Sequence, residues 1–409
     1  MRILIHDFGG YPFVVEAAQE LARRGHEVCL TYVSLVQPER EDLTKHAGDR
    51  LEVQRLTLPE GYAEDKYRFG RRFWHEVKYA RTAASAAKAW KPEVIFSGNA
   101  PTHLQSALHR AAREIGARFV PWVQDFYSNA VDQLLRQKLP VAGGLAGTAF
   151  QMWERHLMRS SDAIIIISPD FQPMLEQWAV DSARIRVIEN WAPIESIPQR
   201  SKDNAWARQH ELHNKFCLLY AGTMGLKHNP ELLAQLARAY QNDPDVRVVV
   251  VAEGKGADHL RDLQLPNLVV LPMQAQEHYA DVLATGDVLV ALLEPDAAVF
   301  SVPSKVLSYL CAARPLLLAV PPENLAARIV SGNHAGEVAA PSDTEAFLRA
   351  AHRLRSDPTS HEHQAACARA YAEEHFRPHA IGERFEEVLG ILGAQEPTHS
   401  ANTRSAAGA

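Results

Sequence analysis

Short, continuous apolar runs alternate with helical patterns along nearly the whole chain. The segment that starts at Phe13 carries apolar residues at helical spacing and ends at Gly25, a residue suited to the end of a helix. Strands that are apolar on both faces are typical of parallel sheets covered by helices on each side. The pattern therefore predicts an α/β protein of doubly wound, Rossmann-like sheets. The predicted strands are RILI, EVCLTYV, EVIFS, RFVPWV, AIIIIS, RIRVI, FCLLYAG, VRVVVVAEG, LVVLP, DVLVALL and PLLLAV.

The strand–helix alternation starts again near residue 215, which indicates two domains. Before it, ENWAPIESIPQRSKDNAWARQH combines prolines with mixed charge, as a linker does. Two such domains leave a cleft between the carboxyl ends of their sheets, where ligands of these folds bind. The predicted parts are a domain at 1–195, a domain at 196–375, a helix at 376–393 that returns to the first domain, and a disordered tail at 394–409.

Composition excludes several classes of protein. The 409 residues carry a net charge of −6, so no global field attracts nucleic acid. No apolar run approaches the roughly 20 residues that span a bilayer. The four cysteines are scattered and form no CxxC pair, which fits a reducing compartment. We therefore expect a cytoplasmic protein that does not cross a membrane, although it can lie against the inner face of one.

The stretch YAGTMGLKHNPELL, from Tyr220 to Leu233, runs a strand into glycines, Lys227 and a helix that starts near Pro230. A cation just ahead of a positive helix end is expected where an anion sits between them. The glycines let the backbone approach that anion closely. The stretch predicts a diphosphate-sized site, and its plain alternative is a glycine turn with a solvated lysine.

A further strand end and a helix start carry a similar signal. In VVVVAEGKGADHL, Glu253 and Gly254 could hold a ribose and admit a phosphate, or form only a tight turn. In SVPSKVLSYLCAARPLLLAV, Ser304 begins a helix and Lys305 falls in its first turn, where a cation is electrostatically unwelcome. Lys305 is expected beside phosphate, or else exposed at a small cost.

In this order and spacing, these stretches resemble the C-terminal half of family 4 glycosyltransferases of the GT-B fold. The bacterial surface-polysaccharide branch that includes the L-fucosamine transferases is similar. DFGGYPFVVEAAQELARRGHEV, PWVQDFYSNAV and WERHLMRSSDAIIIISPDFQPML have counterparts in the N-terminal half, so the resemblance covers about residues 1–390. It implies a donor site on the second domain, an acceptor site on the first, transfer with retention, and no catalytic metal or cofactor.

The resemblance also implies roles for residues, which we carry over where the motifs match. The residues expected at the transfer step are Asp125, Lys227 and Lys305. Those expected at the donor are Gly9, Gly10, Gly222, Thr223, Glu253, Gly254, Ser304 and Ser308.

The chain departs from the family at three of its positions. Many members have two glutamates where Phe300 and Ser308 stand, and an arginine where Thr223 stands. Ser308 can give a ribose one hydrogen bond but is not a carboxylate. These differences leave the donor's identity open.

The segment 65–81, DKYRFGRRFWHEVKYAR, interleaves basic and aromatic residues. It could contact an anionic membrane or a lipid diphosphate, or be an amphipathic helix with a solvated basic face. Since the first domain is where this family meets its acceptor, we expect Arg72 and Trp74 at the acceptor. His103 follows another strand end and could also reach the acceptor, or be an ordinary histidine at the N-terminus of a helix. LLRQKLPVAGGLAGTAFQMWERHLMR could add a second apolar and basic contact. His361, His363, His375 and His379 lack the spacing of a metal site and are expected on a solvated face.

We predict a metal-independent hexosyl- or aminosugar transferase. It would use a nucleoside-diphosphate sugar and a lipid-linked saccharide in surface polysaccharide synthesis. One alternative is a nucleotide-sugar 2-epimerase, which also has two Rossmann-like domains. The other is a non-catalytic nucleotide-sugar-binding subunit, suggested by Phe300 and Ser308.

Overall fold

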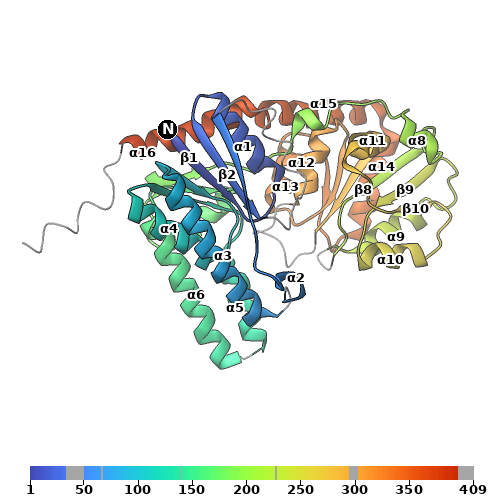
Figure 1. Cartoon of the computed structure of the whole chain (residues 1–409). Helices are drawn as coiled ribbons and strands as arrows, with labels where there is room; N and C mark the ends of the chain where they lie inside the picture. Colours follow the sequence, from blue (N-terminus) through green and yellow to red (C-terminus); the bar gives the residue numbers. More distant parts are fainter. Residues whose placement is uncertain (34–49, 66–67, 139, 226–227, 294–302, 395–409) are drawn as a thin grey trace, which may run out of the picture. The chain divides into compact units, whose positions relative to one another are not determined.

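The computed structural model divides the chain into two compact units, each described here by itself (Figure 1). One unit is Met1–Glu189 with Pro378–Ala409, and the other is Asn190–Arg377. These boundaries lie close to the predicted 195 and 375. The residues that the structure describes are 1–33, 50–65, 68–138, 140–225, 228–293 and 303–394. The predicted disordered tail lies almost wholly outside them.

The N-terminal unit has a seven-stranded parallel sheet in the order β3-β2-β1-β4-β5-β6-β7. Its order reverses at β1, which pairs with both β2 and β4. Ligands of open parallel sheets bind at such a reversal, beyond the carboxyl ends of the strands. The strands are β1 (Arg2–Asp7), β2 (Glu27–Val33), β3 (Leu51–Leu56), β4 (Val94–Ser97), β5 (Arg118–Val123), β6 (Ile164–Ile166) and β7 (Ile185–Val187). The helices are α1 (Pro12–Arg23), α2 (Tyr62–Asp65), α3 (Phe69–Trp90), α4 (Thr102–Ile115), α5 (Tyr127–Lys138), α6 (Pro140–Ser160), α7 (Gln172–Gln177) and α16 (Pro378–Ala394).

The C-terminal unit repeats this plan with a six-stranded parallel sheet in the order β10-β9-β8-β11-β12-β13. Its reversal lies between β8 and β11, and both strands are buried in its core. The strands are β8 (Phe216–Ala221), β9 (Val246–Val251), β10 (Leu268–Leu271), β11 (Val288–Leu292), β12 (Leu316–Ala319) and β13 (Gly336–Ala339). The helices are α8 (Ala205–Gln209), α9 (Pro230–Ala239), α10 (Lys255–Asp262), α11 (Tyr279–Thr285), α12 (Ser304–Cys311), α13 (Leu325–Gly332), α14 (Thr344–Ser356) and α15 (Pro358–His375).

The last helix, α16, belongs to the N-terminal unit and packs against α1. Phe385 is fully buried there, with its ring 5.5 Å from Phe96 and 5.2 Å from Trp122. Arg24, just after α1, donates to the backbone carbonyl of His379, 2.7 Å away. The apolar face of α16 thus completes the core beneath the N-terminal sheet.

The prediction of parallel, doubly wound sheets is confirmed, and every predicted strand forms. Gly25 adopts a φ of +96° just after α1, the left-handed conformation that a glycine permits there. The pattern missed β3 and β13. Both are edge strands, so neither is covered by neighbours on two sides.

Candidate active site

Two glycine loops lie side by side at the carboxyl end of the C-terminal sheet, after the neighbouring strands β8 and β9. The backbone N–H of Gly222 donates to the carbonyl of Val251, 2.9 Å away. Past the strands, Met224 donates in the same way to Glu253 at 2.9 Å. The parallel pairing therefore continues into the loops and holds them together.

The backbone at position 254 requires a glycine for a structural reason that does not depend on any ligand. Its φ is +114°, and a Cβ there would lie only 2.6 Å from the carbonyl oxygen of Met224. Such a contact is too close for any side chain. A tight turn, the plain alternative for this stretch, is therefore enough to explain why a glycine stands at position 254.

Lys305 lies against the first of these loops, in the first turn of α12 as predicted. Its Nζ donates to the hydroxyl of Tyr220, lies 3.9 Å from the centre of the Tyr220 ring, and is 3.5 Å from the carbonyl oxygen of Thr223. The Tyr220 hydroxyl in turn donates to that carbonyl at 2.9 Å. Within the described part of the chain, no carboxylate pairs with Lys305.

The surroundings of Lys305 disfavour its charge. Burial lowers the pKa of this ammonium to about 7, and the amino end of α12 adds a positive partial charge nearby. Burial also raises the pKa of Tyr220, so the phenol stays neutral and cannot act as a counter-ion. An anion bound beside Gly222 would supply a counter-charge that none of the described residues supplies.

The other predicted donor residues differ in how they are placed. Thr223, Glu253 and Ser304 are exposed around the loops. Ser308 already shares a hydrogen bond with Tyr279. Lys227 and Phe300 lie outside the described residues.

In the N-terminal unit, the loop after β1 is tightly turned. Buried Asp7 accepts a hydrogen bond from the backbone of Gly10 at 2.8 Å, and Gly10 has a φ of +76°. A Cβ on Gly9 would lie 2.2 Å from the ring of Tyr11. Asp125 is exposed just after β5, at the same carboxyl edge of this sheet.

The predicted acceptor residues Arg72 and His103 meet on an acid that the sequence reasoning missed. Glu76 is 1% exposed, and its oxygens lie 2.7 Å from Nε of Arg72 and 3.3 Å from Nε2 of His103. Tyr62 donates to the same carboxylate at 3.2 Å. Although burial opposes it, the hydrogen bonds with His103 and Arg72 lower the pKa of Glu76. Trp74 does not join this cluster and is 64% exposed.

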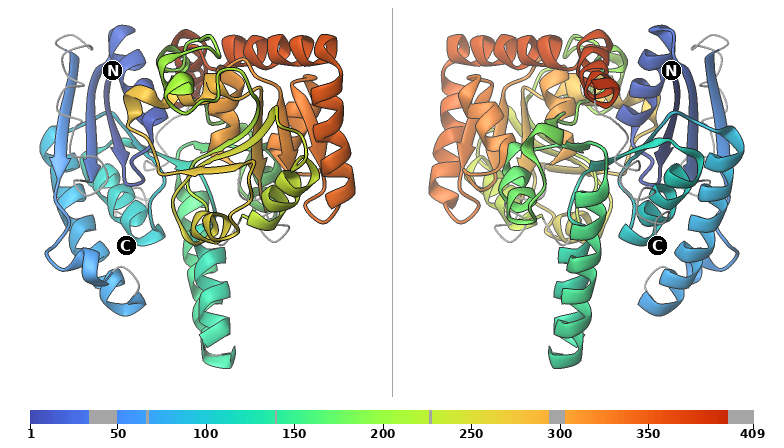
Figure 2. Two further views of the ribbon diagram at one scale, coloured as in Figure 1. Left: turned by 90° about the vertical axis from the view of Figure 1, so that its right-hand side faces the viewer. Right: turned by 90° about the vertical axis from the view of Figure 1, so that its left-hand side faces the viewer.

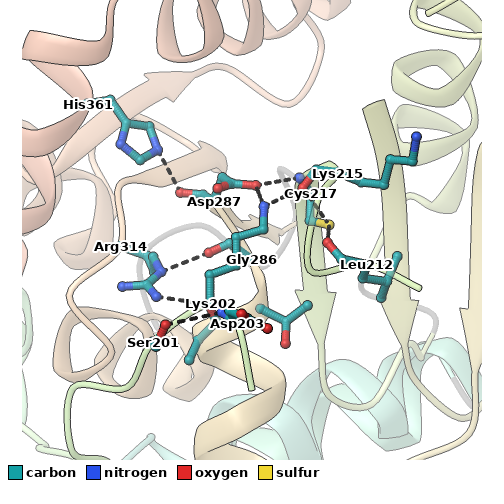
Figure 3. Close-up of polar contacts among 12 residues, drawn as sticks. Ser201, Lys202, Asp203, Leu212, Lys215, Cys217, Gly286, Asp287, Arg314 and His361 are labelled. Atoms are coloured by element: carbon teal, nitrogen blue, oxygen red, sulfur yellow. Dashed lines mark hydrogen bonds and ion pairs between the residues drawn. The ribbon is translucent and has the colours of Figure 1, made fainter. Parts of the chain in front are cut away.

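The amino edge of the C-terminal sheet carries a second polar cluster (Figure 3). The Asp287 carboxylate accepts from Lys202 and, at 2.7 Å, from the backbone N–H of Cys217. Arg314 donates to the carbonyl oxygens of Gly286 at 2.9 Å and Ala284 at 2.8 Å. These groups attach the linker to the sheet, at the end opposite the glycine loops.

One histidine of this cluster corrects an expectation. The ring of His361 is bonded through Nε2 to the carbonyl oxygen of Asp287 at 2.9 Å, so the interpretation of a solvated face is wrong for this residue. The helix α15 packs on the sheet there, which the sequence pattern did not reveal. In the described ranges, no group of three or more His, Cys, Asp or Glu residues could hold a metal ion.

Comparisons with known proteins agree with this architecture. Residues 8–191 match the glycosyl transferase 4-like domain family. The chain is 24% identical over 341 residues to WcaI of Escherichia coli (strain K12), named as a colanic acid biosynthesis glycosyl transferase. That match covers 76% of this chain and 81% of WcaI. It is 22% identical over 272 residues to WbjE of Pseudomonas aeruginosa, named as a glycosyltransferase, covering 64% of this chain and 66% of WbjE.

Among solved structures, Anabaena Alr3699/HepE in complex with UDP has a TM-score of 0.70 at 15% identity. The match covers 95% of this chain and 100% of that one. A further structure of HepE contains UDP-glucose. At this identity the likeness establishes the fold.

Proposed function

We propose that this chain, a family 4 glycosyltransferase with the GT-B fold, moves a hexose or aminosugar from a nucleoside-diphosphate sugar to a lipid-linked saccharide. The transfer would retain the configuration of the sugar. It would serve surface polysaccharide synthesis, the role named for WcaI. The donor, the acceptor and the stereochemistry are the parts of this statement that need experiment.

The environment of Lys305 is the observation that carries the proposal. When the bond to the sugar breaks, negative charge builds on the departing diphosphate. An ammonium beside neutral oxygens gains more from that charge than one already paired with a carboxylate. The nearby backbone of Gly222 and Thr223, together with Lys227, would bind the same group, and Glu253 and Gly254 would face the nucleoside.

A uridine nucleotide is the first donor to test, because HepE was solved with UDP and with UDP-glucose. No protein carboxylate is assigned as a nucleophile. The departing phosphate oxygen would itself help to deprotonate the acceptor hydroxyl, with Asp125 close to the sugar. The proposed reaction uses no metal or cofactor.

For the acceptor, we propose the carboxyl edge of the N-terminal sheet. Gly9 and Gly10 would cover the donor phosphates from their loop, and Arg72 and His103 would orient the acceptor while Glu76 holds them in place. A lipid-linked acceptor also implies contact with a membrane surface, to which the segment 65–81 would contribute exposed Trp74.

The test measures UDP release from UDP-sugars in the presence of EDTA, with and without membrane extract as a source of acceptor. Lys305→Ala is expected to lower the rate about a hundredfold or more. Lys215→Ala is the matched control, because that lysine lies at the opposite edge of the same sheet and donates to the carbonyl of Pro244 at 3.0 Å. Equal rates in Lys305→Ala and Lys215→Ala would contradict the proposed role of Lys305.

Product analysis separates the remaining possibilities. An inverted anomer in the product would contradict retention. Conversion of UDP-N-acetylglucosamine without any acceptor would indicate a 2-epimerase instead. Tight donor binding with no turnover would indicate a non-catalytic binding subunit, which Ser308 at the position of a family glutamate would favour.

A further inference from the structure

The helices α5 and α6 form a hairpin that extends away from the N-terminal sheet (Figures 1 and 2). Glycines let the two helices touch at the backbone. A Cβ on Gly143 would lie 2.0 Å from the carbonyl oxygen of Leu135, and one on Gly147 would lie 2.8 Å from the Cα of Asp132. The glycine face of α6 is thus fully used by α5.

The opposite face of α6 is apolar and exposed. Leu145 is 74% exposed and Met152 is 67% exposed, and a spacing of seven residues places them on one face of the helix. Exposed Ala142 and Ala149 fall on the same face at intervals of three and four. The stretch 140–153 contains no Asp, Glu, Lys or Arg. We name Ala142, Leu145, Ala149 and Met152 the outer stripe.

The exposed charges of α3 and α6 are of one sign, and the one acid of α5, Asp132, is paired with Arg136 at 2.8 Å. Phe73 of α3 meets Phe150 of α6, with ring centres 6.4 Å apart, so these helices adjoin. Each helix contains one acid, and both acids are buried: Glu76 at 1% and Glu154 at 3% exposure. The exposed charged side chains of the two helices are basic: Arg155 and Arg159 lie on α6, and Arg71 of α3 is paired with Asp65 at 3.6 Å. This is a local basic surface on a chain whose net charge is −6.

In the described part of the segment 65–81, most of the aromatic area is covered by the protein. Tyr79 is fully buried, and Phe73 packs against His103 and Phe150. Of the aromatic side chains described in that segment, Trp74 is the exposed one. The apolar part of the surface is therefore the outer stripe.

We propose that the outer stripe of α6 docks onto an anionic lipid bilayer. The uncharged stretch is roughly 20 Å long at about 1.5 Å per residue, shorter than the roughly 30 Å of a hydrocarbon core. Among the helices that the structure describes, none is long and apolar enough to cross a membrane. The stripe can enter only the boundary between headgroups and acyl chains, where the neighbouring arginines meet lipid phosphates. This inference rests on the proposed function for its biological purpose, because a lipid-linked acceptor lies at such a surface.

The test is flotation of the full chain with vesicles of equal parts phosphatidylcholine and phosphatidylglycerol, against vesicles of phosphatidylcholine alone. The unmodified chain is expected to float with the anionic vesicles and to be released by high salt. Leu145→Gln with Met152→Gln should raise the lipid concentration for half binding at least about tenfold. Both side chains are exposed, so the fold should hold, which circular dichroism verifies.

Met273→Gln is the matched control, since Met273 is a 42% exposed methionine of the C-terminal unit and should leave flotation unchanged. The proposal is overturned if the unmodified chain does not float, or if the double variant floats equally well. It is also overturned if light scattering shows a dimer that the double variant splits, because the stripe would then serve a second copy. Release of nucleoside diphosphate in solution is measured in parallel with UDP-, GDP- and dTDP-sugars. A chain that floats but releases no nucleoside diphosphate from any of these donors would defeat the proposed function and leave the docking surface intact.

Discussion

In the C-terminal sheet, charged side chains at the amino ends of the strands (the amino edge) and at their carboxyl ends (the carboxyl edge) have different partners. At the amino ends of the strands, Lys202 is paired with the carboxylate of Asp287, and Arg314 donates to backbone carbonyls (Figure 3). At the carboxyl edge, Lys305 meets a phenol and one carbonyl oxygen. Both edges belong to the same strands and the same core.

The difference follows from the cost of removing charge from water. A nearby counter-charge, such as Asp287, offsets the free-energy cost of desolvating a charged group. Without a counter-charge this cost is not offset. A fold that needed Lys305 only for stability would do better with an apolar residue. Since no carboxylate among the described residues pairs with Lys305, its ammonium indicates a group that is kept for a ligand.

The largest expected effect is a loss of donor turnover on substitution of Lys305, at the carboxyl edge. Lys305→Met should lower donor turnover about a hundredfold or more, while the melting temperature stays equal or rises, because an unpaired and partly buried ammonium is removed. Turnover assays and differential scanning calorimetry on the same samples check this. A lower melting temperature with unchanged turnover would make Lys305 a structural residue.

At the amino edge we expect the opposite result, a loss of stability without a loss of turnover. Asp287→Asn removes the partner of Lys202, and we expect the free energy of unfolding to fall by about 2 kcal/mol. The loss is smaller than for a fully buried pair, because the two side chains keep 23% and 20% of their exposure. Urea denaturation measures it, and turnover per folded molecule should not change.

Gly254→Ala tests the contact between the two glycine loops. The substitution should cost about 1–3 kcal/mol, because the φ of +114° is strained for alanine and the new Cβ meets the carbonyl of Met224. Donor affinity should fall along with stability. Gly332→Ala is a suitable control, since a Cβ there meets nothing within 4 Å. Equal effects of the two changes would refute the role of this contact.

The depressed pKa of Lys305 predicts two opposite pH dependences. The unfolded chain binds this proton more tightly than the folded one, so the contribution of Lys305 to stability should rise from about pH 7 towards the ordinary lysine pKa. Binding of UDP-glucose needs the charged form, so affinity should fall as the pH rises through about 7, by up to tenfold per unit. Titration calorimetry across pH measures the affinity. In Lys305→Met, both the affinity and the stability should depend less on pH.

The smallest effect is expected from Tyr220→Phe. The ring remains below the ammonium, but the hydroxyl that accepts from Lys305 and donates to Thr223 is lost. Donor affinity should fall a few-fold, in line with one hydrogen bond. A loss as large as that of Lys305→Met would mean that the phenol contacts the substrate itself.

The sequence allowed the interior of each sheet to be predicted, because central strands are covered on both faces and show as continuous apolar runs. Two of the four edge strands were missed, because they do not show as continuous apolar runs. LEVQRL of β3 mixes polar and apolar residues, and GEVA of β13 is short and only partly buried.

The candidate site was predictable to a similar degree. Gly254 and Lys305 were found because a glycine at a strand end and a lysine in the first turn of a helix are both visible in the sequence. Tyr220 counted only as a strand residue, and its hydroxyl contacts depend on folding. The spacing of Arg72 and Glu76 could have suggested a pair on one helix, but no pattern links either to His103 before the sheet brings α3 and α4 together.

The position of α16 has a consequence for how the chain is made. Residues 190–377 are an insertion within the N-terminal unit, whose final piece is synthesised last. Until Phe385 emerges from the ribosome, Phe96 and Trp122 lack the aromatic ring that seals them. The second unit is complete before synthesis ends and can fold then. The first unit keeps an apolar surface exposed until α16 is made. We therefore expect a nascent chain that stops before Pro378 to bind a chaperone.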